Sequence, residues 1–285
     1  MGLDLCRDFT SARRVFEEAD ETLGFPLSRL CFEGPADALR QTVNAQPAVL
    51  VVSLACLEAA RESLGEALPP PAYVAGHSLG EYTALAAAGS LTIGAAARLV
   101  RERGRLMQEA GQEEPGGMMA VLGIDCELLE TICSETGVEI ANVNCPGQIV
   151  ISGSKRDLGR ASEQAQSKGA QRVLPLEVSG AFHSRWMRSA HDGLKHALEK
   201  CSFQPLETPL VANVTALEIR DVAAVEKELL AQLCDNVQWQ GSVEHMAAIG
   251  VSTFIEIGPG QVLTGLIRRT SKEAVTQNIG SAEDI

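Results

Sequence analysis

Residues 72–89 contain a serine in a G-x-S-x-G pattern, with a short apolar run before it and a helix-forming run after it. This order of strand, serine and helix is typical of a nucleophile elbow. The turn in such an elbow is so tight that Gly76 and Gly80 have little room for a Cβ atom. Ser78 is therefore predicted at the apex, beside the free N–H groups and the positive dipole end of the following helix. A glycine-flanked turn that merely contains a serine is the alternative, and the agreement of strand, turn and helix disfavours it.

The length of 285 residues allows one large domain, or a domain with an insertion, with a substantial core. Hydrophobic residues make up 45 % of the chain and aromatic residues only 4 %, which together with 26 glycines suggests close-packed helices over a sheet. No run of about 18 uncharged apolar residues occurs, so no transmembrane helix is expected. The first residues show neither a signal-peptide charge pattern nor a myristoylation site, so we expect a cytoplasmic protein.

The net charge of -13 argues against nucleic acid as a partner. An acidic protein partner would need a local basic patch, although basic clusters are more often solvated helix faces. Two such clusters are Arg101, Arg103 and Arg105, and Arg268, Arg269 and Lys272. The eight cysteines include no C-x-x-C and no zinc-like spacing with histidine, so no metal site is expected. Cys56 and Cys133 lie in apolar stretches and are interpreted as reduced core residues.

The hydrophobic pattern predicts an α/β fold, with a hydrolase-like body built on a central, mostly parallel sheet. Helices are expected in the body at 5–23, 47–64 (with Pro47 in its first turn), 80–88, 92–110 (ending at Gly111), 184–200 and 222–234, with a closing helix after 260. Strands are expected at 72–75, 209–214 and 251–257. Three strands are fewer than the roughly four to six that a sheet of this type usually contains.

The stretch 117–178 changes to shorter elements. Strands are expected there at 118–123, 138–144, 148–153 and 171–178, and helices at 127–136 and 155–168. The order β-α-β-β-α-β is the split, ferredoxin-like arrangement. We therefore predict a body made of residues 1–116 and 179–285, and an inserted ferredoxin-like subdomain made of residues 117–178.

A serine nucleophile needs a base, and five histidines compete for that role. His77 belongs to the elbow and cannot easily face the hydroxyl, while His191, His196 and His245 fall in helix-like stretches. His183 instead follows a predicted strand and a Ser-Gly-Ala-Phe turn, at a junction where catalytic groups cluster. The residues alone single out His183 but leave the choice open.

Several segments, in order along the chain, resemble the malonyl-CoA:acyl carrier protein transacylase family. They are Gly-His-Ser-Leu-Gly-Glu-Tyr (76–82), Arg-Gly-Arg-Leu-Met-Gln-Glu-Ala (103–110), Asn-Cys-Pro-Gly-Gln-Ile-Val-Ile-Ser-Gly (144–153), Ser-Gly-Ala-Phe-His-Ser (179–184), Asn-Val-Gln-Trp (236–239) and Glu-Ile-Gly-Pro-Gly-Gln-Val-Leu-Thr-Gly-Leu (256–266). They cover essentially the whole chain. The resemblance implies transfer of a malonyl group from malonyl-CoA to the phosphopantetheine thiol of holo-acyl carrier protein, for fatty-acid or polyketide chain elongation.

By this resemblance, Ser78 is the acylated residue and His183 is the base that activates it. A backbone carbonyl, at Gln232 in this sequence, orients the histidine in place of an acid. The Leu79 N–H contributes to the oxyanion hole. An acidic triad member is then not expected, and the two intervening candidates, Asp125 and Asp157, fall at helix starts where capping is the expected role.

Arg103 matches the arginine that holds the malonyl carboxylate, a task suited to a guanidinium with two parallel N–H bonds. An ordinary helix-surface arginine is the alternative. Met107, Asn144 and Gln148 match positions that line the acyl pocket, although Met107 could equally fill the core. Phe182, before the histidine, resembles the pattern of malonyl-specific domains. The resemblance implies no metal, no bound cofactor and no membrane partner, and a monomer is expected.

Family members normally begin with a buried strand and a Gly-Gln-Gly-Ser-Gln loop, and this sequence starts just after that point. We expect an unfilled position beside the elbow strand, lower stability, and weaker catalysis by on the order of 10²–10³ from one lost oxyanion donor. A truncated version of a longer natural chain is the alternative. Two other functions stay open: an acyl hydrolase or thioesterase, in which water resolves the ester, and a non-catalytic relative that binds carrier protein.

Overall fold

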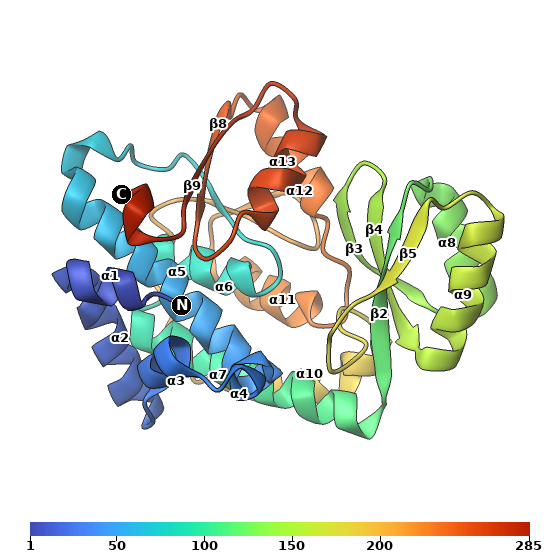
Figure 1. Ribbon diagram of the computed structural model, residues 1–285, viewed down its shortest axis with the longest axis horizontal. Coiled ribbons are helices and arrows are strands. Elements are labelled where there is room, and N and C mark those ends of the chain that lie inside the picture. The colour runs from blue at the N-terminus through green and yellow to red at the C-terminus, as the bar shows by residue number, and fades with distance from the viewer.

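The computed structural model describes residues 1–285. Figure 1 shows a large body of helices around short strands, and beside it a four-stranded sheet with two helices on one face. The two chain ends lie on the same side of the body, where the Ala282 N–H donates to the Asp4 carboxylate at 2.8 Å. The structure confirms the α/β fold class.

Helices make up most of the body, and α5 and α7 pack together at its centre with α2 and α10 against α7. The helices are α1 (Leu3–Asp8), α2 (Thr10–Leu23), α3 (Leu27–Glu33), α4 (Ala36–Arg40), α5 (Thr42–Leu64), α6 (Leu79–Ala87), α7 (Ile93–Glu113), α10 (Arg188–Leu198), α11 (Val222–Gln232), α12 (Trp239–Ala248) and α13 (Val262–Thr270). Short 3-10 turns are η1 (Gly65–Ala67), η2 (Arg185–Met187) and η3 (Ala282–Asp284).

Helix α5 is the buried helix predicted from the apolar run. By length and composition the segment Thr42–Ala67 could cross a membrane, but 67 % of its most apolar window is buried inside the protein. Such burial is what a core helix shows. The predicted start at Pro47 is wrong, because the helix begins at Thr42 and Pro47 lies inside it. Proline removes one internal hydrogen bond, and the buried side chains around it hold the helix together.

Two other helix boundaries also differ from prediction. The helix expected at 5–23 is interrupted at Phe9, where extended backbone separates α1 from α2. Leu5 of α1 and Ala12 and Phe16 of α2 are buried in the same core, so the apolar spacing continues across the break. Gly111 does not end α7, which continues to Glu113. A Cβ on Gly111 would lie 2.5 Å from the carbonyl oxygen of Ser179, so this glycine permits a close approach of two backbones.

The strands of the body are short and form two hydrogen-bonded groups, not one sheet. The first group has the order β1-β6-β7, from β1 (Val74–Ala75), β6 (Leu210–Val211) and β7 (Glu218–Ile219); the second pairs β8 (Thr253–Ile257) with β9 (Val275–Ile279). The β1–β6 and β8–β9 pairs are parallel, as predicted. Because β1 pairs with β6 alone, the elbow strand lies at an edge of its sheet.

The smaller sheet is antiparallel and has the order β3-β4-β2-β5. Its elements are β2 (Gly116–Leu122), α8 (Cys126–Thr136), β3 (Glu139–Cys145), β4 (Gln148–Ser154), α9 (Lys155–Ser167) and β5 (Arg172–Pro175). This is the predicted β-α-β-β-α-β order, with β5 four residues shorter than expected. Asp125 caps α8, whereas Asp157 lies inside α9 and Ser154 is the cap. All eight cysteines are free thiols, and Cys56 and Cys133 are buried as predicted.

Candidate active site

The turn between β1 and α6 holds Ser78 in a strained conformation. Its φ is 50° and its ψ is −104°, an unusual region for a residue with a side chain. Gly76 permits the turn, because a Cβ there would lie 2.0 Å from the backbone carbon and oxygen of Gly80. The same expectation for Gly80 is wrong, since a Cβ at that position meets nothing within 4 Å. The elbow thus depends on one glycine.

Gly76→Ala is expected to lower the free energy of unfolding by about 3 kcal/mol or more, because the new methyl group would overlap fixed backbone atoms. Gly80→Ala is the matched control, and we expect a change within about 1 kcal/mol because alanine suits a helix. Urea denaturation of both variants measures the difference. Equal stability of the two variants would contradict the close approach at Gly76.

Ser78 and His183 are in hydrogen-bond contact, with Oγ 2.7 Å from Nε2. The other ring nitrogen, Nδ1, lies 2.8 Å from the carbonyl oxygen of Gln232. When Nδ1 carries the proton and donates to this carbonyl, Nε2 is left as an acceptor for the serine hydroxyl. The structure thus brings the three predicted residues together from the turn before α6, the segment before η2, and the end of α11. His191 and His196 lie on α10, as predicted, with His191 partly exposed and His196 exposed.

Arg103 lies beside this pair, on the buried side of α7 with 1 % of its surface exposed. One of its terminal nitrogens donates to Ser78 Oγ at 3.1 Å and to Gln232 Oε1 at 2.9 Å, and the other donates to Gln46 Oε1 at 2.6 Å. Its Nε–H has no partner. The alternative of a surface arginine is therefore wrong for Arg103, while it holds for Arg105, which pairs with surface glutamates.

Two buried residues that were not predicted support this centre. Gln46, from α5, accepts the hydrogen bond from Arg103, and its Nε2 lies 3.3 Å from Met107 Sδ. Asn213 accepts from the Ser78 N–H at 2.7 Å and donates to the Gly76 carbonyl at 2.7 Å. The only sequence signal for Asn213 was a polar residue within the apolar stretch predicted as the strand 209–214.

The N-terminus of α6 supplies a free donor next to the nucleophile. The Leu79 N–H is the first of the helix and makes no hydrogen bond to the backbone. The first N–H groups of a helix have no partner within it, and they carry its positive dipole end. This donor is available for a negatively charged oxygen that forms beside Ser78 Oγ.

The remaining predicted residues form the border between the body and the small sheet. Asn144 Oδ1 lies 2.8 Å from Nε2 of His77, the residue before the nucleophile. Gln148 accepts from Arg269 at 2.7 Å and makes no hydrogen bond to Ser78, His183 or Arg103. Phe182 packs on the body core and on the sheet face formed by Met118, Ala120, Ala141 and Val150.

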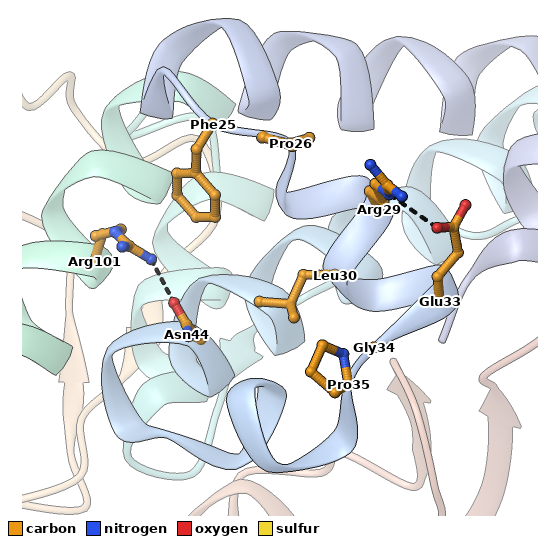
Figure 2. A pocket seen from close by; sticks show the side chains of 9 residues that line it. All are labelled: Phe25, Pro26, Arg29, Leu30, Glu33, Gly34, Pro35, Asn44 and Arg101. Carbon is orange, nitrogen blue, oxygen red and sulfur yellow. Dashed lines mark hydrogen bonds and ion pairs between the residues drawn. The ribbon is translucent and has the colours of Figure 1, made fainter.

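A separate cavity of 670 Å³ is lined by α3, the segments on either side of it, Asn44 of α5 and Arg101 of α7, and none of the active-site residues lines it (Figure 2). Its two arginines are already occupied: Arg29 pairs with Glu33, and Arg101 donates to Asn44 and stacks over the ring of Phe25. We assign it no ligand, because its charged groups are satisfied within the protein.

The acyl transferase domain family matches residues 1–284. The chain belongs to this family. This chain is 45 % identical over 290 aligned positions to the malonyl CoA-acyl carrier protein transacylase of Bacillus subtilis (strain 168). The alignment covers 100 % of this chain and 90 % of that protein. The corresponding protein of Escherichia coli (strain K12) is 41 % identical over 270 positions, covering 93 % and 86 %.

Solved structures show the same likeness for this acyl transferase domain. An acyl-carrier-protein-S-malonyltransferase from Bartonella henselae is 42 % identical with a TM-score of 0.94, covering 100 % of this chain and 92 % of that one. A malonyl-transacylase solved in complex with a type II PKS acyl-carrier protein is 38 % identical with a TM-score of 0.95, with the same coverage.

Proposed function

We propose that this acyl transferase moves a malonyl group from malonyl-CoA to the phosphopantetheine thiol of holo-acyl carrier protein, for fatty-acid or polyketide chain elongation. The names of its relatives support the two substrates. The observation that carries the proposal is the triangle of Ser78 Oγ, His183 Nε2 and the Arg103 guanidinium, joined at 2.7 and 3.1 Å. This triangle combines a nucleophile, its base and a cation for the malonyl carboxylate.

In the first half of the cycle, Ser78 Oγ attacks the thioester carbonyl carbon while His183 Nε2 takes the hydroxyl proton. The Leu79 N–H stabilises the oxyanion of the tetrahedral intermediate. The C–S bond then breaks, and His183 returns the proton to the sulfur of the departing coenzyme A. Its Nδ1–H remains on the Gln232 carbonyl, which holds the ring in the required tautomer.

In the second half, the carrier thiol gives its proton to His183 as its sulfur attacks the seryl ester. The ester C–O bond breaks, and Ser78 Oγ recovers the proton from His183. Coenzyme A is thus part of a substrate, and the cycle uses no metal and no bound cofactor.

Arg103 in this proposal binds the free carboxylate of the malonyl group, with its unpartnered Nε–H as one donor. Met107, Asn144, Gln148 and Phe182 form the wall of the pocket around the acyl group.

We further propose that residues 1–116 and 179–285 are the body, that residues 117–178 are the small subdomain, and that the substrate cleft lies between them. The free cysteines support a cytoplasmic, reducing location.

Intact-mass measurement after brief exposure to malonyl-CoA tests the proposed function. We expect one malonyl adduct, absent in Ser78→Ala and discharged by holo-carrier protein. An adduct that decays equally fast without the carrier would favour the acyl hydrolase or thioesterase. A folded protein that binds carrier but forms no adduct and releases no coenzyme A would overturn the proposal in favour of a non-catalytic relative.

The pH dependence of acylation follows from the burial of His183. Burial, and then the charge of Arg103, lower the pKa of His183 to about 3, and the Gln232 carbonyl opposes this shift. We expect the acid limb of kcat/KM below about pH 5, compared with about 6.5 for a free histidine. Rapid-quench acylation between pH 4 and 8 measures it, and a limb near pH 6.5 would contradict the prediction.

The lowered pKa of His183 also makes the stability of the fold depend on pH. Between about pH 6.5 and 3 the unfolded chain binds a proton at this histidine and the native chain does not, so the stability falls as the pH falls through that window. Above pH 6.5 both states are neutral at this position, and His183 adds no pH dependence.

A further inference from the structure

Glu81 is a fully buried carboxylate that takes no part in the proposed cycle. It lies in the first turn of α6, three residues after the nucleophile. Its Oε1 accepts from the Asn213 N–H at 2.8 Å, and its Oε2 accepts from Gln232 Nε2 at 2.7 Å. A buried charge is costly unless its hydrogen bonds are made, and here both oxygens have donors. The two donors come from segments that touch the active site.

The first contact supports the elbow. Asn213 uses its side chain to bridge the Ser78 N–H and the Gly76 carbonyl, on both sides of the strained turn. Glu81 accepts from the backbone N–H of Asn213, so it fixes the position of the residue whose side chain bridges the turn.

The second contact supports the residues around the hydroxyl. Gln232 Nε2 donates to Glu81 Oε2 and to the Ser78 carbonyl at 2.8 Å, while its Oε1 accepts from Arg103. Its backbone carbonyl accepts from His183. An amide has a donor end and an acceptor end, so a carboxylate at the nitrogen end determines that the oxygen faces Arg103.

We propose that Glu81 is a positioning residue, whose carboxylate sets the direction of the Gln232 amide and so holds Arg103 and His183 in register with Ser78. The proposal rests on the proposed function only in one respect, the malonyl group that Arg103 is proposed to bind. The Gln232 amide lies between the Arg103 guanidinium and the Glu81 carboxyl group. Burial and the neighbouring Glu228 raise the pKa of Glu81, and the N–H donors and Arg103 oppose that rise.

Glu81→Gln changes the chemistry at this position without changing the shape. The new amide must turn its oxygen to the Asn213 N–H, because that backbone donor cannot rotate. Its NH₂ group then faces Gln232, which must turn its own amide over. Arg103 would face an NH₂ group, and the Ser78 carbonyl would lose its donor. A misplacement of this kind can cost up to about 10²-fold in rate.

Two reagents measure the effect on Ser78 by intact mass: malonyl-CoA, and phenylmethanesulfonyl fluoride, whose fluoride leaves as the serine oxygen bonds to sulfur. We expect Glu81→Gln to slow both reactions by about ten- to a hundredfold and to reduce the preference for malonyl-CoA over acetyl-CoA. Glu228→Gln is the control, because the Glu228 carboxylate accepts from the Val214 N–H at 2.7 Å, makes no hydrogen bond to Gln232 or Arg103, and can be replaced there by an amide oxygen. We expect that variant to stay within about threefold of the parent.

Parental rates with both reagents in a folded Glu81→Gln protein would overturn the proposal, as would equal losses in Glu228→Gln. Sulfonylation without malonylation in the parent would instead overturn the proposed function, and the sulfonylation rates would still test Glu81. If Glu81→Gln does not fold, Gln232→Met replaces it, since it removes the same acceptor from Arg103 and keeps the carbonyl for His183. Parental rates and parental malonyl preference in Gln232→Met would equally overturn the proposal.

Discussion

His183→Ala is expected to reduce malonylation of Ser78 by at least about 10⁴-fold, because the hydroxyl then has no group to take its proton. Nothing else in contact with Ser78 Oγ can accept that proton, since the second neighbour is the permanently protonated Arg103. Initial rates of carrier malonylation, measured at substrate concentrations well below KM, give the loss in kcat/KM.

The double variant Ser78→Ala/His183→Ala should be no slower than either single variant, because residues that act as a unit have non-additive effects. His191→Ala is the matched control, as His191 lies on the exposed side of α10 and should leave the rate unchanged. A His183→Ala enzyme within tenfold of the parent, or an additive double variant, would show that another group serves as the base.

Arg103→Ala is expected to lower kcat/KM for malonyl-CoA by on the order of 10²–10³, the loss typical of removing one charge-stabilising donor in a closed site. Acetyl-CoA has no second carboxylate, so its rate should change far less and the preference between the two thioesters should narrow or reverse. Arg103→Lys should recover part of the preference, because an ammonium is a point charge without the paired N–H geometry of a guanidinium.

Competition between the two thioesters for one enzyme sample measures this preference directly. Arg105→Ala is the control, because Arg105 is two residues along the same helix and pairs only with surface glutamates. Equal losses with malonyl-CoA and acetyl-CoA in a folded Arg103→Ala protein would mean that the guanidinium supports the elbow instead of the substrate. Thermal melting of each variant separates that outcome from loss of fold.

The elbow and the β-α-β-β-α-β order of elements were predictable from sequence because their signals are local. Gly76, Ser78 and the following helix lie within a few residues of each other, and the β-α-β-β-α-β order follows from alternating short patterns. The position of His183 in a strand-to-helix junction was also local, but its partner Gln232 was identified only through the family resemblance. No pattern along the chain links these two residues, which are 49 positions apart.

Gln46, Glu81 and Asn213 were not predicted because their roles depend on contacts between distant segments. Asn213 reaches Ser78 across 135 positions, and Gln46 reaches Arg103 across 57. The division of the body strands into two groups was missed for the same reason, since strands of two residues are too short for a periodic signal. The break at Phe9 was missed because it leaves the apolar face continuous.

The state of the cysteines matters for an enzyme that holds an activated acyl group. Burial raises the pKa of Cys56 and of Cys133 to about 12, and it also raises that of the half-buried Cys201 and Cys234. A thiol attacks an ester as its thiolate, so these sulfur atoms are poor nucleophiles at neutral pH. In the proposed cycle these four sulfur atoms would compete poorly for a seryl ester at Ser78, which leaves the acyl group for a thiol that arrives from outside.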